Sequence, residues 1–247
     1  MLVTRQRACV TGGSRGIGRA IAAALTSAGH EVTVLGRTAA TLDAVVSAGE
    51  AHACAVVDVA DADRLAAIVG AGRFDILVNN AGGAETAPFA RTGRDVFQRL
   101  FDLNVVGAVE AIRAALPHMV EARSGRIVNI ASTAGLKGYG YVSAYVAAKH
   151  ALVGLTKALA LEYARSGVTV NAICPGYTDT DLVAAGVEQI VARTQRSAAD
   201  ARAHFEASNP MGRLMRPEEV AQAAVWLAQP LSGGVTGQCI VVAGGEV

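Results

Sequence analysis

The 247-residue sequence predicts an α/β fold, in which a seven-stranded parallel sheet is doubly wound and carries helices on both faces. Three observations predict it. Short apolar runs recur along the chain, segments with helical spacing separate them, and a glycine-rich turn follows the first run. No repeat, low-complexity tract or Pro/Ser-rich linker interrupts the alternation, so we expect a single domain over residues 1–247.

The expected strands are continuous apolar runs rich in Val and Ile, which are typical of a parallel sheet buried on both faces. They are ACVT after Arg7, EVTVLG from Glu31, HACAVVDV from His52, FDILVNN from Phe74, RIVNIAS from Arg126, VTVNAIC from Val168 and QCIVVAG from Gln238. Helical spacing is found in residues 17–28, 65–69, 105–120, 144–165 and 217–228. The stretch 181–209 is polar, and we expect a lid over the substrate at about residues 181–215.

Charge and composition indicate small-molecule partners. The 22 basic and 21 acidic residues are spread along the chain, which leaves no footprint for nucleic acid or an anionic membrane. Residues 1–7 lack the apolar stretch of a signal peptide or membrane span, so we expect a cytoplasmic protein. The four cysteines show no CxxC spacing, so we expect buried thiols and no metal site; they are Cys9, Cys54, Cys174 and Cys239.

The glycine-rich segment TGGSRGIG, residues 11–18, links the first predicted strand to the first predicted helix. Small residues there let the backbone approach a pyrophosphate, and the free N–H groups of the helix N-terminus supply hydrogen-bond donors. A glycine cluster alone is ordinary turn chemistry, but this strand-to-helix position favours phosphate binding. The expected cofactor-binding residues of this segment are Gly12, Ser14, Arg15, Gly16, Ile17 and Gly18.

The end of the second predicted strand bears on the choice of cofactor. An NAD-selective fold places an Asp or Glu there to bind the ribose hydroxyls, whereas this sequence has Gly36 followed by Arg37. A guanidinium can bind a 2′-phosphate through two hydrogen bonds, and Arg15 offers a second charge, so NADP(H) is favoured over NAD(H). The alternative is that Arg37 is a solvated surface residue or stacks on adenine without discriminating the phosphate.

Tyr145 and Lys149 in SAYVAAK are four residues apart, so a helix places both on one face. A phenol with a pKa of about 10 is a poor acid at neutral pH, but a neighbouring ammonium lowers that pKa towards the working range. In a carbonyl reaction Tyr145 would protonate the substrate oxygen. Ser132, at the end of the fifth predicted strand, can donate a hydrogen bond to that oxygen. Taken singly, each of these residues has an ordinary structural explanation.

The spacing of Gly12, Gly16 and Gly18 resembles the TGxxxGxG motif of the classical short-chain dehydrogenases/reductases, and NNAG at residues 79–82 resembles their second motif. The resemblance extends from Thr11 to Gly245 and implies a single-domain Rossmann fold. It also implies a catalytic tetrad of Asn104, Ser132, Tyr145 and Lys149, in which Asn104 holds a water that links Lys149 to solvent. One departure is VAGG, with Ala243, in place of the frequent VDGG.

The same resemblance implies the remaining cofactor contacts. Asp58 meets the adenine ring, Pro175 and Gly176 form a turn beside the nicotinamide, and Thr178 and Thr180 are candidates for its carboxamide. The further positions implied for the cofactor are Val59, Asn80, Ala81, Gly82, Tyr145 and Lys149.

The family implies hydride transfer between a nicotinamide and a carbonyl or secondary alcohol, with Ser132 orienting the oxygen and Tyr145 supplying the proton. GRIVNIASTAG and AYVAAKHALVGLTKALALEYA are most similar to 3-oxoacyl-thioester reductases and aromatic polyketide ketoreductases, so we expect NADP(H)-dependent reduction of a 3-oxoacyl thioester. One alternative is an NAD-dependent dehydrogenase of a hydroxyacid or cyclic alcohol, against which Arg37 argues. A second is a non-catalytic nucleotide-binding regulator, against which the complete tetrad argues.

Substrate selectivity is expected in the variable loops, here 83–89, 136–142 and the lid. Tyr139, Tyr141 and Tyr177 either flank an acyl or ring substrate or simply pack. The lid arginines either contact a phosphopantetheine or CoA phosphate or are solvated; they are Arg193, Arg196, Arg202 and Arg213. The apolar helices at 105–120 and 144–165 imply, by family resemblance, a homotetramer, which light scattering can test.

Overall fold

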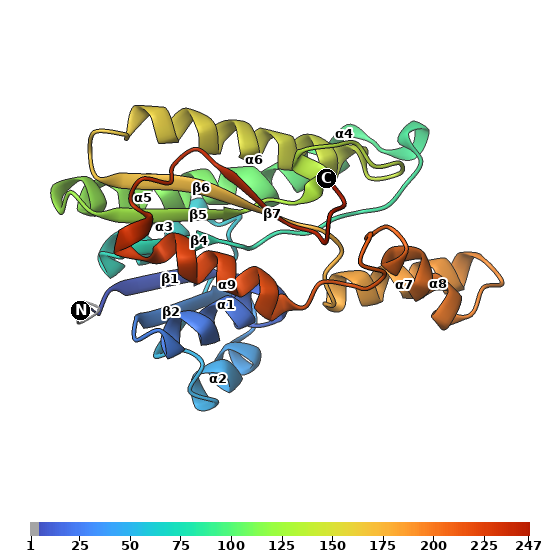
Figure 1. Cartoon of the computed structure of the whole chain (residues 1–247), viewed down its shortest axis with the longest axis horizontal. Helices are drawn as coiled ribbons and strands as arrows, with labels where there is room; N and C mark the ends of the chain where they lie inside the picture. Colours follow the sequence, from blue (N-terminus) through green and yellow to red (C-terminus); the bar gives the residue numbers. More distant parts are fainter. Residues whose placement is uncertain (1–4) are drawn as a thin grey trace.

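A computed structural model describes residues 5–247, in which the predicted apolar runs form one seven-stranded parallel sheet of order β3-β2-β1-β4-β5-β6-β7 (Figure 1). The strands are β1 (Arg7–Thr11), β2 (Glu31–Gly36), β3 (Ala53–Val56), β4 (Ile76–Asn79), β5 (Gly125–Ile130), β6 (Val168–Pro175) and β7 (Cys239–Val242). The expectation that no signal peptide is present concerned residues 1–7, of which residues 1–4 lie outside the described residues.

Helices cover both faces of the sheet, which confirms the predicted doubly wound Rossmann fold. On one face lie α1 (Gly16–Ser27), α2 (Ala39–Ser47) and α9 (Pro217–Ala228). On the other lie α3 (Ala62–Gly72), α5 (Gly107–Glu121) and α6 (Ser143–Glu162), with α4 (Arg94–Phe101) against α6. Short helical turns complete the chain at η1 (Phe89–Arg91), η2 (Asp102–Val106, a π-helix), η3 (Thr133–Gly135) and η4 (Pro230–Ser232).

The two apolar layers between sheet and helices explain why the central strands read as unbroken apolar runs. Every residue of β5 and of β6 is buried, because helices pack on both sides of these strands. Burying one Leu, Ile or Val side chain stabilises a fold by roughly 1.5–3 kcal/mol. These layers hold the sheet rigid, so the loops at its carboxyl edge are carried by a fixed frame.

The edges of the sheet differ from the sequence expectations. Cys9 and Cys174 are buried as predicted, whereas Cys54 and Cys239 are only half-buried, because β3 and β7 are the two edge strands. The run HACAVVDV forms a strand only over β3, and α2 and α4 were not anticipated by helical spacing. The helix expected from residue 105 starts with the π-helix η2, which places Asn104 in a widened turn.

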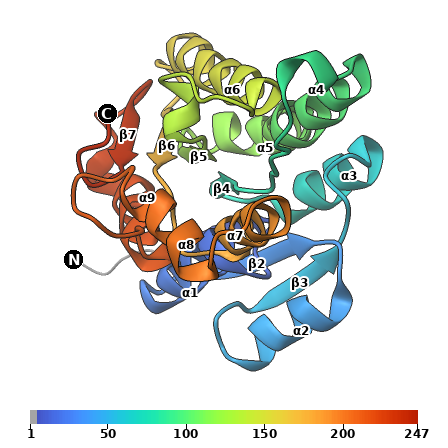
Figure 2. The same ribbon diagram turned by 90° about the vertical axis from the view of Figure 1, so that its right-hand side faces the viewer.

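The strand order places a switch point between β1 and β4, where successive connections leave the sheet in opposite directions. A crevice opens at the carboxyl ends of the strands at such a point, and ligands of doubly wound folds bind there. The polar stretch after β6 forms two helices, α7 (Asp181–Arg193) and α8 (Ala198–Glu206). Figure 1 shows this pair projecting beyond the strand ends, and Figure 2 shows it in front of them.

None of the helices within residues 5–247 combines the length and the apolar character that crossing a membrane requires.

The start of α9 fastens the far end of the α7–α8 segment to the body of the domain. Glu219 accepts a hydrogen bond from the Arg216 backbone N–H, at 2.8 Å, and pairs with the Arg213 guanidinium at 2.7 Å. These hydrogen bonds lower the pKa of Glu219 to about 2.

Because the folded pKa of Glu219 lies below its unfolded value, its stabilising contribution is present above about pH 4.5 and is lost as pH falls towards 2. We expect Glu219→Gln to lower the free energy of unfolding by about 1 kcal/mol at pH 7. The difference from the wild type should shrink progressively below pH 4.5, as measured by urea unfolding between pH 3 and pH 7. The control is Glu218→Gln at the exposed neighbour; an equal effect there would contradict the assignment to Glu219.

Candidate active site

The glycine-rich turn after β1 forms a backbone cradle at the switch point. Gly12 and Gly16 have φ of +64° and +52°, which L side chains rarely adopt. At Gly18 the requirement is space, because an added Cβ would lie 2.3 Å from the Gly12 carbonyl oxygen and 2.4 Å from Asn80 Nδ2. The N-terminus of α1 therefore approaches the turn closely, and its free N–H groups fit a pyrophosphate.

Hydrogen bonds join this cradle to the turn after β4. Asn80 Nδ2 donates to the carbonyl oxygens of Thr11, at 3.0 Å, and Gly12, at 3.1 Å. Thr11 Oγ1 accepts from the backbone N–H groups of Asn80 and Ala81, at 3.0 and 3.1 Å. The NNAG motif thus holds the glycine turn in shape. Thr11 is not among the cofactor-binding residues predicted from the sequence, although a threonine that ends a strand just before the first glycine is a usable signal.

A buried polar chain fixes α6 on the sheet. Asn79 Nδ2 donates to Asn129 Oδ1, and Asn129 Nδ2 donates to Thr156 Oγ1, each at 2.9 Å. This chain runs from β4 through β5 to α6, the helix that carries Tyr145 and Lys149. Because buried polar groups must be paired, the chain specifies one position of α6 along the strands.

The structure brings the four predicted catalytic residues together at the carboxyl edge. Lys149 is 4% exposed, and its Nζ donates to the Ile130 carbonyl oxygen at 2.8 Å and lies 5.7 Å from the centroid of the Tyr145 ring. The Ser132 hydroxyl accepts a hydrogen bond from the Ala134 N–H at 3.1 Å and lies near Tyr145, whose pKa it lowers.

Asn104 completes the group from the π-helix η2. Its Nδ2 donates to the carbonyl oxygens of Leu100, at 2.8 Å, and Gly83, at 3.0 Å. Gly82 lies between Asn104 and Lys149, since an added Cβ would be 2.7 Å from Asn104 Oδ1 and 3.5 Å from Lys149 Nζ. A larger residue at position 82 would therefore collide with the Asn104 amide.

The electrostatics of Tyr145 differ from the sequence expectation. Burial raises the pKa of the Tyr145 phenol, and the nearby Ser132 hydroxyl opposes that rise. Burial also lowers the pKa of Lys149 to about 8. The expectation that Lys149 lowers the pKa of Tyr145 is wrong for the protein alone, because the ammonium faces a carbonyl oxygen and the ring rather than the hydroxyl. Tyr145 therefore keeps its proton at neutral pH, as a proton donor must.

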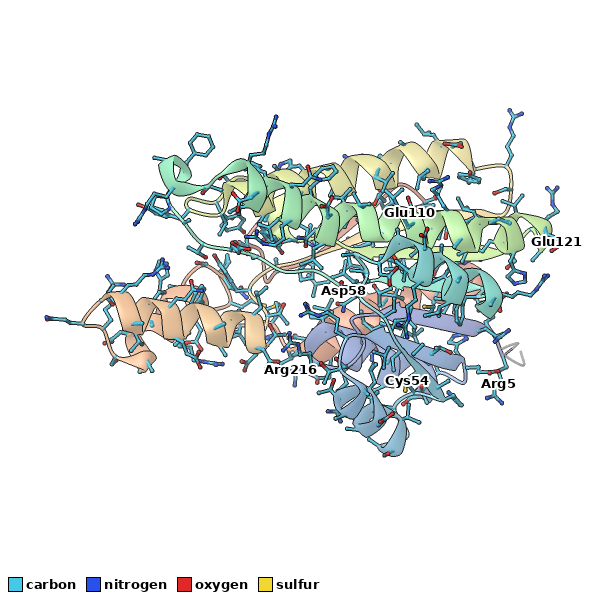
Figure 3. The ribbon with its side chains drawn as sticks, turned by 180° about the vertical axis from the view of Figure 1, so that it is seen from behind. Arg5, Cys54, Asp58, Glu110, Glu121 and Arg216 are labelled. Carbon is cyan, nitrogen blue, oxygen red and sulfur yellow. The ribbon has the colours of Figure 1, made fainter. Side chains whose placement is uncertain are left out.

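Both predicted phosphate-binding cations are exposed at the carboxyl edge, and each lies near a carboxylate. Arg37 Nη1 is 4.0 Å from Asp58 Oδ2, and Arg15 Nη1 is 3.4 Å from Asp181 Oδ2 on α7. Figure 3 shows Asp58 and Arg216 towards the α7–α8 side of the body, and Arg5 at the opposite end. Exposed ion pairs of this kind contribute little to the free energy of folding, so both guanidiniums can turn towards an anionic ligand.

The segment after β6 reaches the glycine turn. Thr180 lies against Gly16, where an added Cβ would be 3.2 Å from Thr180 Cγ2, while Thr178 Oγ1 donates to the Gly176 carbonyl oxygen at 3.0 Å. The backbone of Met215 pairs with this segment, donating to Tyr177 O at 2.9 Å and accepting from the Asp179 N–H at 2.8 Å. The two ends of the α7–α8 segment are therefore joined.

The other predicted cofactor positions lie around the same edge. Pro175 ends β6 and is buried, and Val59 packs against Gly107 at the start of α5. Ile17 is half-buried in α1, and Ser14 Oγ lies near Gly36 at the end of β2.

Of the three loop tyrosines, two come together. The rings of Tyr139 and Tyr177 are 6.1 Å apart, and Tyr177 is 5.0 Å from Phe205 on α8. Tyr141 points into solvent and is 68% exposed. Among the arginines of the expected lid, Arg202 pairs with Asp179 and Glu206, and Arg213 pairs with Glu219, which favours a structural explanation for those two. Arg193 and Arg196 are exposed.

Over the part of the chain that the structure describes, no three His, Cys, Asp or Glu side chains gather in a way that could hold a metal ion.

Comparisons with known proteins show which proteins this chain resembles in sequence and fold. The family model described as short chain dehydrogenase matches residues 6–190. The chain is 40% identical over 248 residues to cis-4-hydroxycyclohexanecarboxylate dehydrogenase of Sinomonas cyclohexanicum, covering 96% of this chain and 95% of that protein. It is 38% identical to the 3-oxoacyl-[acyl-carrier-protein] reductase of Synechocystis sp., covering 99% and 98%. A crystal structure of a variant actinorhodin polyketide ketoreductase with NADPH aligns with a TM-score of 0.93, at 35% identity, covering 98% and 97%.

Gly18→Ala tests the cradle, because the added Cβ would collide with the Gly12 carbonyl oxygen and the Asn80 amide. We expect the Kd for NADPH, measured by nicotinamide fluorescence, to rise about tenfold or more, equivalent to about 1.4 kcal/mol of binding free energy. Gly70→Ala in α3 is the matched control, since its Cβ would make only an ordinary contact at 3.8 Å. Unchanged NADPH affinity in a folded Gly18→Ala protein would show that the cradle does not hold the cofactor.

Proposed function

The chain belongs to the short-chain dehydrogenase family, and from that premise we propose that it is an NADP(H)-dependent reductase of 3-oxoacyl thioesters. The observation that carries the proposal is the convergence of Ser132, Tyr145 and Lys149 beside a glycine cradle. Relatives named as 3-oxoacyl reductase and as polyketide ketoreductase support the substrate class.

In this mechanism the substrate carbonyl oxygen lies between the Ser132 and Tyr145 hydroxyls. Ser132 orients the oxygen by hydrogen bonding, and Tyr145 donates its proton as negative charge develops there. A bound nicotinamide supplies the hydride. Lys149 gains and loses a proton near neutral pH, because burial lowers its pKa to about 8, which suits a group that resupplies protons towards Tyr145. Asn104 lines the route from Lys149 to solvent.

The preference for NADP(H) rests on Arg37 and Arg15. Strand β2 ends at Gly36 without the acid that would bind both ribose hydroxyls, and the Arg37 guanidinium lies next in the chain, 69% exposed. A 2′-phosphate can replace the Asp58 carboxylate as its partner. The bound NADPH named for the ketoreductase structure supports this choice.

A second candidate substrate is a cyclic alcohol or ketone. The 40%-identical relative named cis-4-hydroxycyclohexanecarboxylate dehydrogenase favours it, and the paired Tyr139 and Tyr177 rings suit a ring as well as an acyl chain. The hydroxyls of Ser132 and Tyr145 would serve this oxidation in reverse, which requires Tyr145 first to lose its proton, a step that its raised pKa disfavours at neutral pH.

We also propose a homotetramer assembled through α5 and α6. These helices leave apolar side chains in solvent, with Leu161 83% exposed and Val120 38% exposed.

The cofactor and substrate proposals are tested by one assay. Nicotinamide absorbance is followed with NADPH and NADH in parallel against acetoacetyl thioester, cyclic ketones and simple aldehydes. We expect selective NADPH oxidation with the thioester, and we expect Arg37→Ser to raise the KM for NADPH about tenfold while leaving that for NADH unchanged. Preference for NADH would refute the cofactor proposal, and turnover of cyclic substrates alone would refute the thioester.

Tyr145→Phe removes the proton donor without changing the ring. We expect kcat to fall by about 10²–10⁴-fold, while the Kd for NADPH changes less than about threefold. The matched control is Tyr141→Phe, at the solvent-exposed loop tyrosine. Retention of more than a tenth of kcat in Tyr145→Phe would exclude Tyr145 as the acid.

A further inference from the structure

Glu246 is a buried carboxylate at the end of the chain. After β7, Gly244 and Gly245 adopt φ of +59° and +91°, which turn the backbone towards the end of β6, and the Glu246 N–H donates to Ala243 O at 3.2 Å. The Glu246 side chain is 3% exposed. Carboxylates are almost never buried to this extent unless they are paired, so its partners indicate what it holds.

The first partners lie in the loop that follows Ser132. The Tyr139 hydroxyl donates to Glu246 Oε1, and Lys137 Nζ lies 3.2 Å from the same oxygen. Thr133 Oγ1 is 2.6 Å from the Tyr139 hydroxyl oxygen. Because that hydroxyl has a single hydrogen, which goes to Glu246, Thr133 is the donor to Tyr139. Two consecutive hydrogen bonds therefore connect Glu246 to the residue next to Ser132.

The second contact is with the loop that follows β6. An added Cβ on Gly176 would lie 2.8 Å from Glu246 Oε2, so this oxygen rests against the Gly176 backbone. Within residues 5–247, Oε2 has no hydrogen-bond partner. Burial raises the pKa of Tyr177, and the negative charge of Glu246 raises it further. Glu246 thus touches both loops that border the Ser132 and Tyr145 hydroxyls.

An aromatic row extends from this contact to the lid. The Tyr139 and Tyr177 rings meet edge to face at 80°, and Tyr177 meets Phe205 of α8 at 65°. Only Tyr139 of the three is held by a charged acceptor. The Tyr139 hydroxyl accepts a hydrogen bond from Thr133 and donates one to Glu246. The ring therefore cannot rotate away without breaking a buried, charge-assisted hydrogen bond.

We propose that Glu246 is a positioning residue for the substrate: it locks Tyr139, and through it Tyr177, as a rigid wall beside Ser132 against which the acyl or ring group packs. The inference rests on the proposed function in one respect, namely that a carbonyl substrate enters beside Ser132. A carboxylate serves this purpose where an apolar residue would not. Only a hydrogen-bond acceptor fixes the rotation of Tyr139, and only a negative charge attracts Lys137.

The kinetic test compares Glu246→Ala with the conservative Glu246→Gln, using the best ketone from the substrate panel. Loss of a charge-assisted hydrogen bond should raise the ketone KM about tenfold in Glu246→Ala, with kcat within about threefold and the NADPH KM within about twofold of wild type. Glu246→Gln keeps an acceptor for Tyr139 and should restore most of the ketone affinity. Tyr139→Phe should match Glu246→Ala, and the double variant should be no worse than either single variant.

The control variant is Glu218→Gln, at an exposed glutamate of α9, for which no kinetic change is expected. Hydrogen exchange gives a readout independent of turnover. Glu246→Ala should speed exchange of backbone amides in residues 136–141 and 177–180 while leaving β1 unchanged. Unaltered exchange there, an unchanged ketone KM, or a parallel loss of kcat and of NADPH affinity would each overturn the proposal. A wild-type protein that reduces no carbonyl would instead refute the proposed function.

Discussion

The site depends on the hydrogen bonds between Asn80 and Thr11, which join the ends of β1 and β4. At this point the helical connections diverge to opposite faces of the sheet. A single net hydrogen bond contributes only about 0.5–1.5 kcal/mol, but leaving buried partners unpaired costs more. The Asn80 side-chain amide donates hydrogen bonds to the carbonyl oxygens of Thr11 and Gly12, and these bonds fix the backbone conformation of the glycine turn. Both the cofactor cradle and the edge carrying Ser132 are placed relative to that turn.

Much of the fold follows from the sequence because its signals are local. Continuous apolar runs identify the strands, and the burial of all of β5 and β6 explains why they are so clear. The same reasoning fails at the edges, where Cys54 and Cys239 occupy strands with one open side. A four-residue spacing also puts Tyr145 and Lys149 on one face of α6 without any knowledge of the tertiary structure.

What the sequence does not predict arises from contacts between distant residues. Glu246 and Tyr139 are 107 residues apart, and no pattern near either one indicates that they meet. The direction of the pKa shift of Tyr145 is also a tertiary property, because it depends on how fully the fold removes the phenol from water. Residue spacing specifies which groups share a helix face; it does not specify the dielectric environment around them.

The pairing of Met215 with the backbone at Tyr177 and Asp179 makes the α7–α8 excursion a closed module. Its ends meet at one point, so residues inserted or deleted between them change the closure entropy only slowly and do not reach the sheet. Evolution can therefore redesign this excursion while the strands, the glycine turn and Tyr145 stay in place. Within such a family we therefore expect the residues that perform the reaction to change slowly and the residues that select the substrate to change quickly.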